Sequence, residues 1–237
     1  MTGNIDLAIL QMINGSESSF LDGLMVTLTS GFTWIPLYIA LLYLVISNND
    51  NMTKIMLIIL CGIGCVVFSG GICDFIIKPM IGRIRPINDD MLDGIIYTVG
   101  DMSNKDFSFF SSHAANTTSL TMFFALLVRN RKFTVAMTVW ALVNCYTRLY
   151  LGMHYPFDVL VGIAWGALVG LLLYSVYLRV YDRMFPDVEF ISTQYTSKGY
   201  TIITIDIVLL TMSVLYLYAI LRSFIGCLLY TSDAADE

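Results

Sequence analysis

Charged residues are scarce in this chain. Only 13% of its 237 residues are Asp, Glu, Lys or Arg, whereas 57% are hydrophobic, and its mean hydropathy is +0.74. This composition lies far from that of a soluble domain. The formal net charge of −5 also leaves no basic excess that would favour a nucleic-acid partner. We therefore expect an integral membrane protein that binds no nucleic acid.

The chain also lacks the patterns that indicate a metal site or a secreted precursor. It has five cysteines, and their spacing matches no zinc pattern. We interpret the four that lie in apolar runs as inert small residues: Cys61, Cys65, Cys73 and Cys145. The N-terminus lacks a basic region followed by an apolar run, so we expect no cleavable signal peptide.

Histidine is rare, and one of the two histidines lies in an unusual place. His154 belongs to the segment 147–158, which sets several polar or ionisable groups into very apolar sequence. A charge inside a membrane segment costs several kcal/mol unless it is paired with another group or has a functional role, so such groups indicate a functional site. The other histidine is His113, and we expect the two to act together.

Long apolar runs predict an all-α fold, a polytopic membrane helical bundle. A span needs roughly 20 apolar residues, and helices satisfy their own backbone in lipid. Six runs qualify as spans: residues 24–46, 56–77, 114–128, 133–146, 157–178 and 201–225. Residues 4–13 have the pattern of a short amphipathic helix that lies on the membrane surface. We expect one domain at residues 1–226, because residues 227–237 resemble the translation of a transposon sequencing adapter and are interpreted as a non-native tail.

The basic residues predict the orientation in the membrane. Alternation through six spans places the N-terminus, the loop 78–112 and the turn 148–156 on one face. Once Lys78, Arg85 and Arg148 are set aside as site residues, three basic residues remain on that face. The opposite face carries seven: Lys54, Arg129, Arg131, Lys132, Arg179, Arg183 and Lys198. Basic residues favour the cytoplasmic side. We therefore expect the candidate site to face outward.

Three cations on the outer face indicate an anion site. Lys78 and Arg85 are seven residues apart, close to two helical turns, so a helical segment ending at Pro86 would aim both the same way. With Arg148 they form a group that calls for an anion such as phosphate. Asp74, four residues before Lys78, is interpreted as an ion-pair partner of that lysine.

The histidines complete a phosphoryl-transfer site. His154 and Asp158 are four residues apart, which would place them on one helix face, where the carboxylate could fix the ring and leave one nitrogen free to attack. His113 follows Ser111 and Ser112 at a helix start, which favours an anion. We expect His154 to attack phosphorus and His113 to act as acid and then as base. No metal or cofactor is required, because the cations stabilise the charge.

These residues resemble the type-2 phosphatidic-acid phosphatase family. Its signatures are Lys-x6-Arg-Pro, Pro-Ser-Gly-His and Ser-Arg-x5-His-x3-Asp. The chain has them in the same order and spacing, over about residues 20–180, as Lys78 to Arg85-Pro86, Phe110-Ser111-Ser112-His113, and Thr147-Arg148 to His154 to Asp158. The resemblance implies that His154 is the nucleophile, Asp158 its orienter and His113 the acid, and that phosphate is bound by Lys78, Arg85, Arg148, Ser111 and the Ser112 backbone.

The chain departs from the signatures at three positions. Phe110 replaces Pro, Ser112 replaces Gly and Thr147 replaces Ser. Thr147 keeps a hydroxyl group. Ser112 matters only if its backbone must be left-handed, where a residue other than glycine adds strain.

The resemblance implies a lipid phosphatase of the bacterial cytoplasmic membrane. The layout looks most like the undecaprenyl-diphosphate phosphatases of the bacitracin-resistance type, so undecaprenyl diphosphate is the expected substrate. Lipid A, phosphatidylglycerol phosphate and phosphatidate are alternatives, because the motifs contact only the phosphate. A vanadate-dependent haloperoxidase would use similar residues, and a non-catalytic lipid-phosphate binder or transporter would need the cations alone. The acidic residues Asp89, Asp90 and Asp93 are interpreted as a solvated loop rather than a divalent-cation site.

Overall fold

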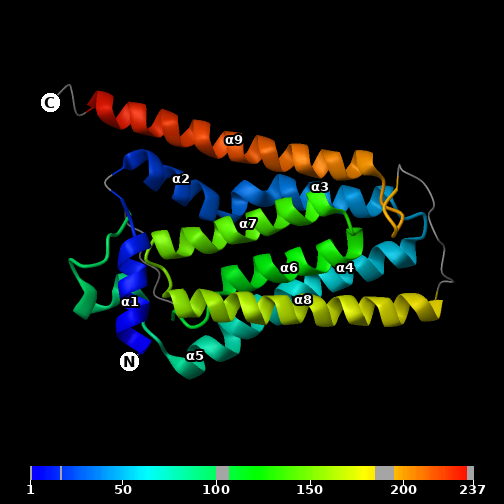
Figure 1. Cartoon of the computed structure of the whole chain (residues 1–237), viewed down its shortest axis with the longest axis horizontal. Coiled ribbons are helices and arrows are strands. Elements are labelled where there is room, and N and C mark those ends of the chain that lie inside the picture. The colour runs from blue at the N-terminus through cyan, green and yellow to red at the C-terminus, as the bar shows by residue number, and fades with distance from the viewer. Residues whose placement is uncertain (1, 17, 100–106, 185–194, 234–237) are drawn as a thin grey trace.

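The computed structural model describes residues 2–16, 18–99, 107–184 and 195–233. The described part is a bundle of helices, and its only β pairing is the isolated bridge between Tyr195 and Thr201. The longer helices are α1 (Thr2–Ile13), α2 (Ser19–Thr29), α3 (Ile35–Ser47), α4 (Met52–Val66), α6 (Ser112–Val128), α7 (Arg131–Tyr150), α8 (Pro156–Met184) and α9 (Ile202–Asp233). All but α1 run roughly along one axis (Figure 1). The predicted all-α fold is confirmed.

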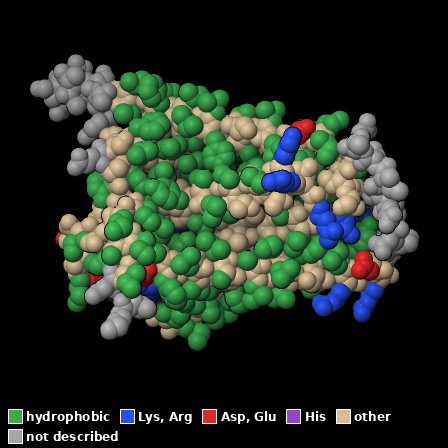
Figure 2. Space-filling model, viewed as in Figure 1, with side chains coloured by type: hydrophobic (Ala, Val, Ile, Leu, Met, Phe, Trp, Pro, Cys, Tyr) green, Lys and Arg blue, Asp and Glu red, His purple; other side chains and the backbone are tan. Residues whose placement is uncertain are grey.

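The lengths and apolar character of the helices suit a membrane. Among the described residues, Met52–Ile81, Pro156–Met184 and Ile202–Leu228 are long and apolar enough to cross it, and the bent pair α2 and α3 adds a fourth span if it is counted as one. Helices α6 and α7 lie along the same bundle axis (Figure 1). Hydrophobic side chains cover most of the face shown in Figure 2, as contact with lipid requires. The count of six spans stays a prediction.

The expected single helix at residues 24–46 is broken. Helix α2 ends at Thr29, and the chain bends by 63° before α3 continues. In the short helical turn between them, the hydroxyl group of Thr33 and the indole N–H of Trp34 donate to backbone carbonyl groups of α2 over 2.6 and 2.8 Å. These bonds satisfy carbonyl groups that a helix end leaves unpaired. The expected span at residues 24–46 therefore consists of two helices joined by a bend, because local capping ends α2.

Helix α4 continues past its expected end and carries residues to the site. It widens into π-type turns at Val67–Gly71 and Cys73–Ile77 and ends with α5 (Lys78–Ile81). Gly82 then adopts a left-handed conformation, with φ of 62°, which closes the helix. The side chain of Asn116 on α6 accepts two hydrogen bonds from the first wide turn. This contact fixes α4 against α6.

Glycines on α8 allow α6 to pack closely against it. A Cβ atom on Gly166 would lie 2.3 Å from the carbonyl oxygen of Ala115, and one on Gly162 or Gly170 would meet the α6 backbone almost as closely. Small residues at this spacing let two membrane helices approach each other. The close packing brings the start of α6 beside the start of α8.

The two ends of the bundle differ. Helix α1 crosses one end (Figure 1), with Ile5, Ile9 and Met12 exposed and Asp6 and Leu10 buried. This arrangement agrees with the predicted surface helix. The other end holds the junction of α6 with α7 and the end of α8, and basic side chains gather toward that end in Figure 2. Residues 227–233 of the expected tail continue α9, and residues 234–237 lie outside the described residues.

Candidate active site

A polar cavity of about 510 Å³ lies at the end of the bundle that α1 crosses. It is lined by Asp74, Phe75, Lys78, Pro79, Arg85, Phe107, Ser112, His113, Arg148 and His154. The structure thus brings together, from three distant segments, six of the residues that the sequence predicts as site residues. Ser111 and Asp158 do not line the cavity.

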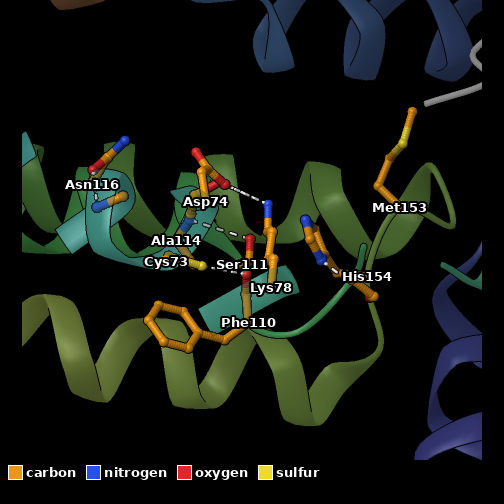
Figure 3. A network of polar contacts seen from close by, with 12 residues as sticks. Cys73, Asp74, Lys78, Phe110, Ser111, Ala114, Asn116, Met153 and His154 are labelled. Atoms are coloured by element: carbon orange, nitrogen blue, oxygen red, sulfur yellow. Dashed lines mark hydrogen bonds and ion pairs between the residues drawn. The ribbon is translucent and has the colours of Figure 1, made fainter. Parts of the chain in front are cut away.

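Lys78 enters the cavity from the last turn of the α4–α5 helix. The side chain is buried, and its Nζ atom lies 2.7 Å from Asp74 Oδ1 and 3.3 Å from Ser112 Oγ. Figure 3 shows Lys78 reaching toward the carboxylate of Asp74. The expected ion pair with Asp74 is therefore present. Among the described residues that line the cavity, Asp74 is the only one with a carboxylate.

Arg85 reaches the same cavity by a different route from the one expected. The helix ends at Ile81, so Arg85 lies in extended chain, with φ of −73° and ψ of 149°. The seven-residue spacing from Lys78 therefore does not represent two helical turns. Arg85 is nevertheless buried, and one of its contacts is Met153 Sδ at 3.5 Å. The left-handed Gly82 redirects the chain, which the spacing argument missed.

Arg148 lies in the last turn of α7 and is 6% exposed. Its Nη1 atom donates to the hydroxyl group of Thr29, over 2.8 Å, at the point where α2 breaks. Its Nε atom is buried and has no hydrogen-bond partner among the described residues. A buried unpaired donor is costly. This donor is therefore available to an anion that enters the cavity.

Ser111 and Ser112, at the start of α6, have different surroundings. Ser111 is fully buried, and its hydroxyl group caps the helix by accepting from the Ala114 N–H over 3.4 Å. Ser112 and His113 line the cavity at the positive end of the helix dipole. The hydroxyl group of Ser111 already caps the helix, and the contact of Ser111 with phosphate stays a prediction.

His154 does not lie on a helix, contrary to the spacing argument. It occupies the turn between α7 and α8, since α8 begins at Pro156. Gly152 in this turn has a φ of 64°, and a Cβ atom there would lie 2.8 Å from Ile87 Cγ2. A glycine is therefore required both by the backbone conformation and by the close contact.

The surroundings of His154 keep its ring neutral. The side chain is 1% exposed. Burial, and then the positive charges of Arg148, Arg85 and Lys78, lower the pKa of His154 well below its ordinary value. A neutral imidazole keeps a lone pair on one ring nitrogen. The cavity therefore combines an uncharged imidazole with three cations.

Asp158 is linked to His154 through Ser108. One carboxylate oxygen accepts from the Ser108 hydroxyl group, whose oxygen lies 3.3 Å from His154 Nδ1. The other carboxylate oxygen is bound by Arg83. No direct hydrogen bond joins Asp158 to His154 in the described structure. The one-face geometry predicted for this pair was wrong, because only Asp158 belongs to a helix.

Arg83 and Asp6 are part of the site's support and were not predicted. Arg83 binds Asp6 over 2.8 Å as well as Asp158, and its guanidinium group lies 3.8 Å from the centre of the Tyr155 ring. Burial lowers the pKa of Arg83, but the hydrogen bond and charge of Asp6 and the charge of Asp158 outweigh this effect and raise it. Asp6 also accepts from the backbone N–H of Phe157 over 2.8 Å. The sequence analysis predicted a surface helix for this stretch and assigned no role to its one acid, Asp6.

Each of the three departures from the family signatures has a defined place in the structure. Ser112 is the first residue of α6, and Arg129 is the only non-glycine residue with positive φ in the described part of the chain. The Thr147 hydroxyl group donates to the Asn144 carbonyl within α7 over 2.7 Å. Phe110 packs against Trp165, with ring centres 6.3 Å apart. Ser112 therefore needs no left-handed conformation.

The acidic loop has a structural role. The Asp89 carboxylate caps a short helical turn by accepting from the Met91 N–H over 3.1 Å. No group of three or more His, Cys, Asp or Glu residues placed to hold a metal ion occurs among the described residues.

An apolar helical bundle with a cationic, histidine-containing cavity at one end is the arrangement of a membrane enzyme that acts on phosphate esters. Residues 58–182 match the sequence model of the PAP2 superfamily. The chain belongs to this family, and it is a lipid phosphatase, as its motifs predict. The resemblance drawn from the three signatures is confirmed.

Individual relatives cover most of the chain. A lipid A 4′-phosphatase of Bacteroides thetaiotaomicron is 31% identical over 93% of this chain and 97% of its own length. A lipid A 4′-phosphatase of Porphyromonas gingivalis is 32% identical over 72% of each chain. An undecaprenyl-diphosphatase of Bacillus subtilis is 26% identical over 79% of this chain and 90% of its own length.

One solved structure shares the fold. It is a transmembrane PAP2-type phosphatidylglycerolphosphate phosphatase from Bacillus subtilis, with a TM-score of 0.58 and 21% identity. The match covers 76% of this chain and 87% of the other. The membrane bundle described above is therefore a fold known from an experimental structure.

Proposed function

We propose that this lipid phosphatase removes the 4′-phosphate of lipid A by way of a phosphohistidine intermediate. The observation that carries the reaction is the cavity in which three buried cations surround a neutral His154. The two lipid A 4′-phosphatases that match most of the chain support the substrate. The reaction uses protein side chains and no cofactor.

The first step forms a phosphorus–nitrogen bond. His154 Nε2 attacks phosphorus in line with the leaving oxygen, the ester P–O bond breaks, and His113 gives its proton to that oxygen. Burial, and then the charges of Arg148, Lys78 and Arg85, lower the pKa of His113 to about 3 in the empty cavity, and the negative charge of the bound phosphate favours its proton. The non-bridging oxygens are held by Lys78, Arg85, Arg148 and Ser112. Arg148 Nε gains the hydrogen-bond partner that it lacks in the empty cavity.

The second step regenerates the enzyme. A water molecule takes the position left by the alcohol, and His113, now neutral, accepts its proton as the water attacks phosphorus. The phosphorus–nitrogen bond breaks, inorganic phosphate leaves, and His154 recovers its lone pair. Atoms and charge balance over the two steps, and each histidine returns to its starting state.

Asp74 favours a phosphate monoester over a diphosphate. Its side chain is 46% exposed, and it is the one acid that the described residues contribute to the cavity lining. A carboxylate accepts hydrogen bonds from the hydroxyl groups of a sugar, whereas it repels the second phosphate of a diphosphate. Undecaprenyl diphosphate, the substrate expected from the layout, is the second candidate, and the Bacillus relative supports it.

We place the active site on the outer face of the bacterial cytoplasmic membrane. The cavity lies at the end of the bundle crossed by α1, and basic side chains gather toward the other end. The positive-inside rule then makes the basic end cytoplasmic. Lipid A would be reached in the outer leaflet, after it has crossed the membrane.

A phosphate-release panel tests this proposal. The purified protein in detergent is given lipid A, undecaprenyl diphosphate, phosphatidylglycerol phosphate and phosphatidate, and the lipid products are analysed by mass spectrometry with fragmentation. We expect kcat/KM to be highest for lipid A, with loss of the phosphate from the 4′ position. Preference for undecaprenyl diphosphate would overturn the substrate, and no phosphate release from any lipid would overturn the reaction.

A further inference from the structure

We infer that Ser108 is a positioning residue that connects Asp158 to the nucleophile His154. The inference rests on the proposed reaction, and it assigns a role to a residue outside the three signature motifs. Ser108 is fully buried among aromatic neighbours in the segment that leads to α6. Its hydroxyl group contacts both Asp158 Oδ2 and His154 Nδ1.

The direction of each hydrogen bond follows from the groups involved. An ionised carboxylate can only accept, so the Ser108 O–H donates to Asp158. The Ser108 oxygen is then left with lone pairs, and it accepts from His154 Nδ1–H over 3.3 Å. Nδ1 therefore carries the proton, and Nε2 carries the lone pair that attacks phosphorus. Ser108 selects the tautomer that the proposed reaction needs.

The neighbours of Ser108 hold it in this position. Its backbone N–H donates to the Arg83 carbonyl over 2.7 Å. The Asp158 carboxylate is fixed from its other side by the Arg83 guanidinium, which Asp6 anchors in turn. Each carboxylate oxygen thus has a side-chain partner, and the contact between Asp158 and the ring runs through the serine. As positive charge develops on His154 during attack, the polarised hydroxyl group stabilises it.

A double-mutant cycle separates this role from a direct action of Asp158. We expect Ser108→Ala to lower kcat roughly 10- to 100-fold, as partners of a functional histidine do, with little change in KM because Ser108 does not line the cavity. Asp158→Asn should lower kcat in the native background and add almost nothing in Ser108→Ala. Multiplicative losses in the double variant would overturn the inference.

Two control variants accompany the double-mutant cycle. Ser108→Thr retains the hydroxyl group and should restore most of kcat if its methyl group is accommodated, which thermal unfolding of each variant will report. Ser223→Ala removes another buried serine hydroxyl group, bonded to the Phe20 carbonyl, and should leave kcat unchanged.

A spectroscopic readout does not depend on activity. The chain has two histidines, so ¹⁵N-histidine labelling together with a His113→Asn variant assigns the ring signals of His154. We expect Nδ1 to be protonated in the native chain and the tautomers to mix in Ser108→Ala. An unchanged tautomer in that variant would refute the role of Ser108. Inactivity of the native chain toward every lipid phosphate would refute the proposed function instead.

Discussion

Replacement of Arg148 by lysine should lower the activity without lowering the stability of the empty protein. In the empty cavity Nη1 of Arg148 is bonded to Thr29, and the buried Nε atom has no partner in the described part of the chain. Lysine keeps the charge but offers a single compact donor group. It cannot bind Thr29 and a phosphate oxygen with the same fixed geometry.

The size of the effect follows from the bonds that are lost. A hydrogen bond to a charged group is worth about 1.5–3 kcal/mol. If the phosphate contact of Nε forms in the transition state, its loss lowers kcat/KM roughly 10- to 150-fold, at about 1.4 kcal/mol per factor of ten. The empty protein should not be destabilised, because the substitution also removes a buried donor without a partner.

The assay is phosphate release from lipid A, measured together with thermal unfolding in the same detergent. Arg179→Lys serves as the matched control, since that arginine is exposed on α8 far from the cavity, and it should change neither quantity. Native kcat/KM in Arg148→Lys would refute the assignment of Nε to the phosphate. A large fall in the unfolding temperature would mean that Arg148 mainly supports the fold.

Three further predictions follow from neighbouring contacts. Thr29→Val removes the buried acceptor of Arg148 Nη1 and should cost about 1–3 kcal/mol in the free energy of unfolding, read from denaturation in detergent; unchanged stability would contradict that bond. Asp74→Asn should raise the ratio of diphosphate to monoester turnover on the order of tenfold, because it removes a like charge from the cavity; an unchanged ratio would exclude Asp74 from substrate selection. The pKa of His154 is lowered in the folded chain. Below a pH of about 6.5, His154 therefore binds a proton in the unfolded chain but not in the folded chain. Stability should therefore decrease on acidification by up to about 1.4 kcal/mol per pH unit from this residue, and His154→Asn should lose that part of the slope.

The main features of the fold could be predicted from sequence because lipid imposes strong constraints. Apolar runs long enough to span a membrane must be helical, and the α4, α8 and α9 helices follow from that rule. The break after Thr29 could not be predicted in the same way. It depends on side chains of the next turn that bond back to α2, which hydrophobicity does not report.

The composition of the cavity was also predictable, but its geometry was not. Spacing brought Lys78, Arg85 and His154 to attention, and all three line one cavity. The helical reasoning attached to those spacings failed, because Gly82 turns the chain with positive φ within the segment expected to be helical, and His154 lies in the turn before α8. The motif residues meet through tertiary packing rather than through a shared helix.

The supporting residues were the hardest to predict. Asp6 is separated from Asp158 by most of the chain, and Arg83 binds both. Ser108 is a single hydroxyl group in an aromatic run, without a spacing relation to His154. Contacts between distant segments of this kind leave no local pattern, so they require the three-dimensional structure.

Trapping of the phosphorylated enzyme shows directly whether His154 is the nucleophile. With p-nitrophenyl phosphate the leaving group needs no proton, so His113→Asn should still form the phosphorus–nitrogen bond and then hydrolyse it slowly. We expect a burst of nitrophenol close to one equivalent of enzyme. We also expect an alkali-stable, acid-labile phosphate, which mass spectrometry should locate on His154. A phosphate on another residue, or the same burst after His154→Ala, would contradict the account.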